Sequence, residues 1–101
     1  VIFQNVTITS NVIIGEHVII LPNSIISHDD IIGSFTCITG GVCISGEVTI
    51  GKACYLGSNS AIRDRINIGD CSLIAMGSNV IKDVPANSTV MGNPARIVNL
   101  N

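Results

Sequence analysis

Aliphatic side chains recur at every sixth position along most of this chain. The series runs from Ile2 to Val80 without a gap (positions 2, 8, 14 and so on), which makes fourteen consecutive hexads. A period of six fits neither an α-helix, which repeats near 3.6 residues, nor a single alternating strand. The pattern predicts a short strand and a corner that stack as a coil, so we expect a solenoid.

A second inward position lies four residues after each aliphatic residue, which is two residues before the next one. Residues two apart on a strand share a face, so both side chains point inward. Each hexad then points two side chains inward, holds one outward residue between them, and uses three residues for a turn. Ile31, for example, lies outward between Asp30 and Ile32. Three such sides close a triangular coil of eighteen residues. The second inward position is mostly small or β-branched: Val6, Val12, Val18, Ser24, Thr36, Val42, Val48, Cys54, Ser60, Ser72 and Ser78.

Glycines at a spacing of eighteen support the three-sided coil independently. They form one column, Gly15, Gly33, Gly51 and Gly69. A corner that requires a positive φ, or a very close approach of two backbones, would select glycine at such a column.

The outward positions divide into three unequal faces. An apolar stripe on a soluble protein usually marks a subunit contact, and a triangular prism suits cyclic threefold packing. We therefore expect a homotrimer. The first face carries Ile19, Cys37, Tyr55 and Leu73, the second Ile13, Ile31, Thr49 and Asn67, and the third Ile25, Cys43, Ala61 and Asn79.

Composition narrows the possible partners and the compartment. The net charge is −2 and the five basic residues are scattered, which argues against nucleic acid and anionic membranes as partners. Although 47% of the residues are hydrophobic, no apolar run approaches the roughly 20 residues that span a bilayer. Four cysteines without C-x-x-C spacing predict neither a disulfide nor a zinc site. We expect a cytoplasmic protein without a signal peptide.

Pro85 divides the chain into two parts. A proline cannot donate to a strand ladder, and the six-residue count stops before it. The sequence predicts a hexapeptide-repeat coil over residues 1–84 and a capping tail over residues 85–101. Because the chain opens on Val1, we expect it to be the C-terminal part of a longer chain.

The segment from Ser27 to Asp30 carries the chemistry that stands out. Asp30 occupies an inward slot that elsewhere is small or apolar, and a buried carboxylate needs partners. Gly46 lies eighteen residues after His28, at the same corner of the next coil, and leaves space beside the ring of His28. An imidazole that Asp29 or Asp30 orients can act as a general base near neutral pH. The alternative is that these polar side chains only satisfy one another at a solvated corner. His17 lacks this context, and we assign it no role.

Several segments resemble the hexapeptide-repeat acyltransferases. They are the hexads, the pair His28-Asp29 followed by Ile32-Gly33, the stretch from Gly46 to Gly51, and the ending Gly92-Asn93-Pro94-Ala95. The resemblance is nearest to the branch of bacterial sialic acid O-acetyltransferases and UDP-amino-sugar N-acetyltransferases of surface polysaccharide biosynthesis. It implies a left-handed parallel β-helix, a homotrimer, and acetyl-CoA bound in a groove between neighbouring subunits. We expect no metal.

The resemblance also implies roles for individual residues. The catalytic histidine falls on His28 and its acidic neighbour on Asp29. Some relatives carry a second histidine where this chain has Cys37, so a hydrogen bond to the cofactor from that ring is lost here. The cofactor contacts fall on Cys37, Gly46, Ser58 and Met76, with the small residues Gly57, Ala75 and Gly77 beside them.

Two corners of the prism have to contribute to such a site. Ser58 and Met76 share one corner, whereas His28 and Gly46 share another, and a six-residue side spans at most about 20 Å. The cofactor therefore reaches both corners most easily when they belong to adjacent chains. Phosphates of the cofactor could pair with Lys52, Arg63, Arg65, Lys82 or Arg96, and Glu47 and Asp64 could shape the acceptor site.

These observations favour an acetyl-CoA-dependent acetyltransferase that acts on an amine or hydroxyl of a sugar, a nucleotide sugar or sialic acid. The alternative is a non-catalytic β-helix that serves as a scaffold or trimerisation domain. A carbonic anhydrase built on the same coil needs three zinc-binding histidines, and this chain has two. An ice-binding solenoid would show a regular threonine array, which is missing from this sequence.

Overall fold

The computed structural model describes residues 1–100, with side chains described to residue 99, and all its elements are strands. Thirteen strands of two residues recur every six positions, as the hexads predict. They are β1 (Thr7–Ile8), β2 (Ile13–Ile14), β3 (Ile19–Ile20), β4 (Ile25–Ile26), β5 (Ile31–Ile32), β6 (Cys37–Ile38), β7 (Cys43–Ile44), β8 (Thr49–Ile50), β9 (Tyr55–Leu56), β10 (Ala61–Ile62), β11 (Asn67–Ile68), β12 (Leu73–Ile74) and β13 (Asn79–Val80).

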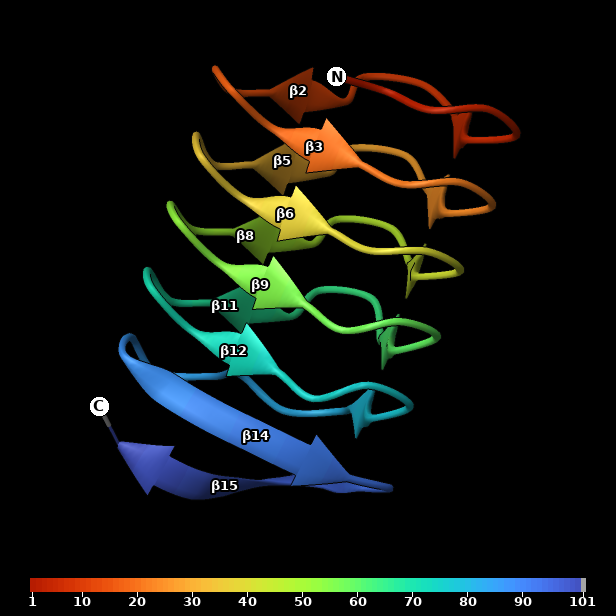
Figure 1. Cartoon of the computed structure of the whole chain (residues 1–101). Coiled ribbons are helices and arrows are strands. Elements are labelled where there is room, and N and C mark those ends of the chain that lie inside the picture. The colour runs from red at the N-terminus through yellow and green to blue at the C-terminus, as the bar shows by residue number, and fades with distance from the viewer. Residues whose placement is uncertain (101) are drawn as a thin grey trace.

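Three parallel sheets form the sides of the prism. Their orders are β1-β4-β7-β10-β13, β11-β8-β5-β2 and, starting from the C-terminal hairpin, β15-β14-β12-β9-β6-β3. Partners in the coil lie eighteen residues apart, as in the pair Ile13 and Ile31. In Figure 1 the chain runs leftwards along the rear strands β2, β5, β8 and β11, and returns rightwards along β3, β6, β9 and β12 while it descends. The fold is therefore a left-handed parallel β-helix, as the resemblance implied.

The core is a column of isoleucines enclosed by the three sheets. From Ile20 to Ile74 every sixth residue is at most 2% exposed. The second inward position is buried as well, and this includes Asp30, which is 0% exposed. Each fully buried aliphatic side chain contributes about 1.5–3 kcal/mol relative to an exposed one. The stacked hexads thus supply most of the favourable free energy of folding.

The corners use a left-handed backbone at one position of nearly every hexad. That position holds residues other than glycine in most coils, among them Asn23 (φ 68°), Asp29 (φ 60°) and Ala53 (φ 53°). The glycine column predicted from the sequence lies two residues earlier and does not have positive φ. A Cβ on Gly33 would lie 2.5 Å from the carbonyl carbon of Gly51. Close backbone approach, the second of the two reasons considered, therefore explains this column.

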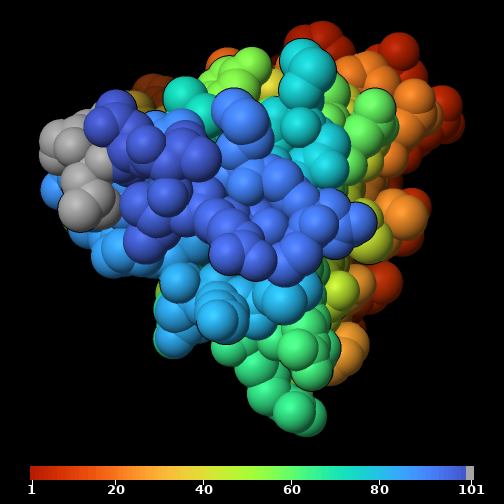
Figure 2. Space-filling view, turned by 90° about the horizontal axis from the view of Figure 1, so that it is seen from below, coloured from red at the N-terminus to blue at the C-terminus, as the bar shows by residue number. Residues whose placement is uncertain are grey.

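The C-terminal segment closes one end of the prism. After an isolated bridge from Val84 to Ile68, β14 (Ser88–Gly92) pairs in parallel with β12, and β15 (Ala95–Leu100) returns antiparallel to β14. The end-on view in Figure 2 shows this hairpin lying across the C-terminal end. The hairpin satisfies the edge of the first face, which would otherwise be open.

The outward positions agree with the predicted faces. Ile13 is 63% exposed, Ile31 44% and Tyr55 47%, so large apolar side chains lie on the surface of the early coils and of the first face. All four cysteines are free, with Cys54 buried and Cys71 exposed at a corner. Within residues 1–100 no helix is long and apolar enough to cross a membrane.

Candidate functional site

His28 and Asp29 form the turn between β4 and β5, at the corner where the third face meets the second. Asp29 adopts φ 60°, a conformation that Asp tolerates better than most residues because its short polar side chain bonds locally. The turn brings Nδ1 of His28 to 3.0 Å from Oδ2 of Asp29. Both side chains are about half exposed, at 55% and 50%. The predicted pair is therefore in contact and open to solvent.

Gly46 lies directly beside the imidazole, one coil further on. A Cβ on Gly46 would lie 2.5 Å from Nε2 and 2.6 Å from Cε1 of His28. The sequence predicted that Gly46 leaves open space beside the ring, but the ring itself fills that space. The Glu47 N–H also donates to the carbonyl of His28 at 2.9 Å, which fixes the turn on the next coil.

The surroundings of His28 make its ring a better base. Its pKa is raised from the ordinary value, chiefly by the hydrogen bond to Asp29, against some desolvation, and further by the charges of Asp29, Glu47 and Asp30. The contact between Asp29 and Nδ1 favours the tautomer that carries its proton on Nδ1. Nε2, the nitrogen nearest Gly46, is then left as the basic atom.

Asp30 lies under this turn and is not solvated. Its Oδ1 accepts a hydrogen bond of 2.8 Å from the Val48 N–H, whereas its buried Oδ2 has no hydrogen-bond partner. Burial raises the pKa of Asp30 to about 6. The expectation that this inward carboxyl would find a partner is thus met at one oxygen only.

Charged side chains continue the corner beyond His28. Arg65 lies 3.8 Å from Glu47 and 3.8 Å from Asp64, and Arg63 lies 3.9 Å from Asp64. All four are exposed by half or more, so these contacts are loose and contribute little to stability. They give the His28 corner a set of carboxylates that can reorient toward a ligand.

The predicted cofactor residues of the later coils gather at a second corner, between the first face and the third. Met76 is 75% exposed, and the Ser58 hydroxyl donates to Thr39 Oγ1 at 3.3 Å. A Cβ on Gly57 would lie 2.5 Å from the backbone nitrogen of Met76, whereas a Cβ on Gly77 would meet nothing within 4 Å. Gly77 therefore leaves open space at this corner, beside the exposed side chain of Met76 and the half-buried Ala75.

A single chain does not bring the predicted site residues together. His28, Asp29 and Gly46 lie at one corner and the group from Gly57 to Gly77 at another, with the third face between them. Cys37 is half-buried on β6, in the first face, which lies opposite the His28 corner. Within residues 1–100 no group of three histidine, cysteine, aspartate or glutamate side chains is arranged to hold a metal ion.

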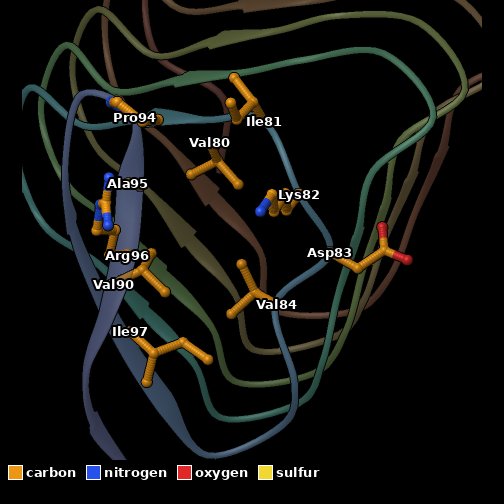
Figure 3. Close-up of a pocket in the computed structure, with 10 residues that line it drawn as sticks. All are labelled: Val80, Ile81, Lys82, Asp83, Val84, Val90, Pro94, Ala95, Arg96 and Ile97. Carbon is orange, nitrogen blue, oxygen red and sulfur yellow. The ribbon is translucent and has the colours of Figure 1, made fainter.

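A hollow of about 380 Å³ lies at the C-terminal end of the prism, away from His28. Figure 3 shows Val80, Val84 and Val90 lining it beside Lys82 and Arg96. The Asp83 carboxylate is directed out of the hollow and accepts from the Asn67 N–H at 2.8 Å. Of the residues predicted for catalysis or cofactor binding, only Lys82 and Arg96, two of the candidate partners of the cofactor phosphates, line this hollow.

Acetyltransferases are among the known proteins that are similar to this chain in sequence and in structure. No family model matches it. Serine acetyltransferase 2 of Arabidopsis thaliana is 45% identical over 49 residues, which are 48% of this chain and 15% of that protein. The matched segment is thus a small part of its curated relative.

Solved structures share the coil over most of this chain. UDP-N-acetylglucosamine O-acyltransferase (LpxA) from Moraxella catarrhalis has a TM-score of 0.87 and 30% identity over 89% of this chain and 35% of that one. PerB from Caulobacter crescentus, in complex with CoA and GDP-perosamine, has a TM-score of 0.77 and 20% identity over 97% of this chain and 56% of that one. At that identity the likeness to PerB shows the fold alone.

Proposed function

We propose that this chain, whose repeat, fold and sequence similarity are those of the hexapeptide-repeat acetyltransferase family, transfers an acetyl group from acetyl-CoA to a sugar. His28 is the general base in this proposal. The observation that carries it is the contact of 3.0 Å between His28 Nδ1 and Asp29 Oδ2, on a half-exposed ring. The carboxylate orients the imidazole and raises its pKa, as a base near neutral pH requires.

The proposed reaction is direct transfer. As the acceptor amine or hydroxyl attacks the thioester carbonyl, its proton passes to Nε2 of His28. The tetrahedral intermediate then collapses, the carbon–sulfur bond breaks, and the proton on His28 neutralises the departing thiolate. Asp29 stabilises the imidazolium that forms between these steps. No covalent intermediate on the protein is required, so Cys37 needs no nucleophilic role.

The second corner offers a surface on which acetyl-CoA can bind, but the residues of the His28 corner are not beside it in the same chain. Gly77 leaves open space at that corner, and Ser58 and Met76 offer a hydroxyl and an exposed thioether. Because the third face separates this corner from His28, we propose that a neighbouring copy supplies it and that the working assembly is a homotrimer. Gly46 then belongs to the subunit that supplies His28, whereas Cys37 lies on the first face, opposite the His28 corner, and is not on the same side of the cleft.

The acceptor we propose is an amino sugar, carried on a nucleotide or within a cytoplasmic intermediate of surface polysaccharide biosynthesis. Glu47 and Asp64 add carboxylates to the His28 corner beside Arg65 and Arg63, and these carboxylates can accept hydrogen bonds from the amino group of the acceptor. PerB was crystallised with CoA and GDP-perosamine, which supports such a pair of ligands for this coil. Transfer to a hydroxyl, as in the sialic acid branch, is the competing possibility.

A non-catalytic scaffold or trimerisation domain is the second candidate function, favoured by the exposed isoleucines of the early coils. The two candidates differ in ligand binding, because a scaffold has no reason to bind acetyl-CoA. Calorimetry with acetyl-CoA therefore separates them before any acceptor is known.

Substitution of His28 tests the catalytic proposal. In an assay of thiol release from acetyl-CoA with a panel of amino sugars and sialic acids, His28→Gln should lower kcat by about 100-fold or more, because a general base contributes about 10²- to 10⁴-fold. The binding of acetyl-CoA and the oligomeric state should stay unchanged. His17→Gln is the matched control, since His17 is an exposed corner residue whose ring stacks on Phe35 at 5.2 Å. Activity of His28→Gln within a few-fold of wild type would remove His28 from the mechanism.

A further inference from the structure

Asp30 is the polar exception in an apolar column of the core. The residues that stack above and below it at spacings of eighteen are Val12, Val48, Ile66 and Val84. Valine or isoleucine therefore fills this slot in each of the remaining coils, and the fold by itself does not require a carboxyl here. A buried polar group where an apolar one would do usually reflects a local requirement.

The position of Asp30 links it to the His28 turn. Two successive amides of the next coil bind this corner: the Glu47 N–H donates to the His28 carbonyl at 2.9 Å, and the Val48 N–H donates to Asp30 Oδ1 at 2.8 Å. One coil further on, the Arg65 N–H donates to the Gly46 carbonyl at 3.0 Å in the same way. Val48, however, offers no side-chain acceptor to the amide of Ile66. The second bond is thus a special feature of the His28 corner in this column.

Satisfying an amide does not explain the choice of aspartate. Ser24 and Thr36 flank Asp30 in the same coil, and their hydroxyls accept from the amides of Val42 and Cys54 at 3.3 and 3.2 Å. A serine would therefore suffice at position 30, without leaving a buried oxygen unpaired as Asp30 Oδ2 is. What aspartate adds is a shorter, stronger bond and a second oxygen beneath the imidazole turn.

We propose that Asp30 is a positioning residue, which clamps the turn of His28 onto Gly46 and so holds Nε2 of the imidazole at the backbone of the next coil. The ring and Gly46 are already so close that a Cβ would collide with Nε2. A small shift between these two coils would therefore move the ring. The role of the clamp in catalysis rests on the proposed function, whereas its effect on the ring does not.

Electrostatic interactions between Asp30 and His28 also support the proposed clamp. The nearby titratable groups are His28, Asp29 and Glu47, and the Asp30 carboxyl raises the pKa of His28 whereas His28 lowers that of Asp30. The largest cause of the raised pKa of His28, however, is the hydrogen bond to Asp29 within the turn that the clamp fixes. Loss of the clamp should therefore be visible in the titration of His28.

The test compares Asp30→Val, which installs the residue of the neighbouring coils, with Asp30→Asn, which keeps an acceptor for the Val48 N–H. Both are studied by NMR in the full chain with labelled histidine. In wild type and Asp30→Asn we expect a nuclear Overhauser contact between the His28 ring and the Gly46 Hα. In Asp30→Val we expect that contact to be lost and the pKa of His28 to fall toward its ordinary value, below that of Asp30→Asn. Where acetyl transfer is measurable, Asp30→Val should lower kcat about tenfold with an unchanged KM for acetyl-CoA.

The outcomes separate the two proposals. An Asp30→Val protein that keeps the ring contact and the His28 titration of wild type overturns the clamp, as does an Asp30→Asn protein that loses the contact as fully as Asp30→Val. If Asp30→Val does not fold, Asp30→Ala is read by the same criteria. Since the NMR readouts need no acetyl transfer, an active His28→Gln enzyme would refute the general base and leave the clamp standing.

Discussion

At the residue scale, the His28 corner combines an accessible base with a concealed acid. His28 and Asp29 are half exposed, whereas Asp30, the next residue in the chain, is fully buried. The separation follows from the hexad, because position 30 points inward and positions 28 and 29 form the turn. Three adjacent residues thus meet different dielectric surroundings, which raises the pKa of Asp30 through burial and that of His28 through a hydrogen bond.

Asp30 should make stability fall as pH rises. Its folded pKa of about 6 lies above the ordinary 3.8, so between these values the native state binds more protons than the unfolded state. The unfolding free energy then decreases by about 2 kcal/mol from pH 4 to pH 7. Urea denaturation at fixed protein concentration, on wild type and Asp30→Asn, measures this effect.

The difference between the two proteins isolates Asp30. His28 contributes in the same direction, since its raised pKa favours the native state below 6.5 and the gain is lost as pH rises through the folded value. That contribution remains in Asp30→Asn. A difference in stability between wild type and variant that stays constant from pH 4 to pH 7 would contradict a buried, titrating carboxyl.

At the element scale, the corners make two separate demands on the backbone. The glycine column at positions 15, 33, 51 and 69 needs the absence of a Cβ because the next coil is too close. The hexad position two residues later needs a positive φ at nearly every corner. After the column glycines it holds His17, Phe35, Ala53 and Cys71, whereas at other corners it is often asparagine, as at Asn5, Asn11 and Asn23. The spacing of the glycines predicts the first demand, whereas the second was not predicted, although asparagine recurs at that hexad position.

Opposite substitutions at one corner distinguish these two demands. Gly33→Ala should destabilise the protein by about 1–3 kcal/mol, because its Cβ meets backbone atoms of Gly51 and Lys52 that cannot move aside. Ala53→Gly should stabilise it by up to about 1 kcal/mol, because alanine at φ 53° is strained. Thermal and urea unfolding measure both changes. If both variants changed the free energy of unfolding in the same direction, the two separate demands would be contradicted.

At the scale of the whole molecule, the predicted site residues lie at separate corners of the prism, and one chain does not bring them together. The chain measures 31 × 23 × 21 Å, and a face separates the His28 corner from the corner of Ser58 and Met76. Apolar side chains are exposed on the early coils and along the first face. Association of copies would cover this surface and bring unlike corners together, which is the assembly we propose.

Mixed assemblies test whether two chains share one site. His28→Gln and Met76→Trp are each expected to be nearly inactive, the second because an exposed indole blocks the cofactor corner. After the two are unfolded and refolded together at equal amounts, about a quarter of the sites should combine an intact His28 with an intact Met76 from its neighbour. Recovered thiol release at roughly that fraction supports the shared cleft. No recovery, in a mixture that sediments as trimers, would place both residues in the site of a single chain.

The sequence by itself determined the coil, its eighteen-residue turn, its inward and outward positions, and the placement of His28 beside two aspartates, Asp29 and Asp30. These properties are repeated in every hexad or lie between adjacent residues, so one chain displays them many times or at short range. The hand of the coil came from resemblance, because parallel crossovers are otherwise right-handed.

Only the tertiary structure decided what fills the space at Gly46, which oxygen of Asp30 is paired, and how the C-terminal hairpin joins the first face. Each of these depends on side-chain rotamers and on contacts between residues about sixteen to eighteen positions apart, which occur once in the molecule and leave no periodic trace. A repeat specifies the positions that stack, whereas packing decides which atoms meet there.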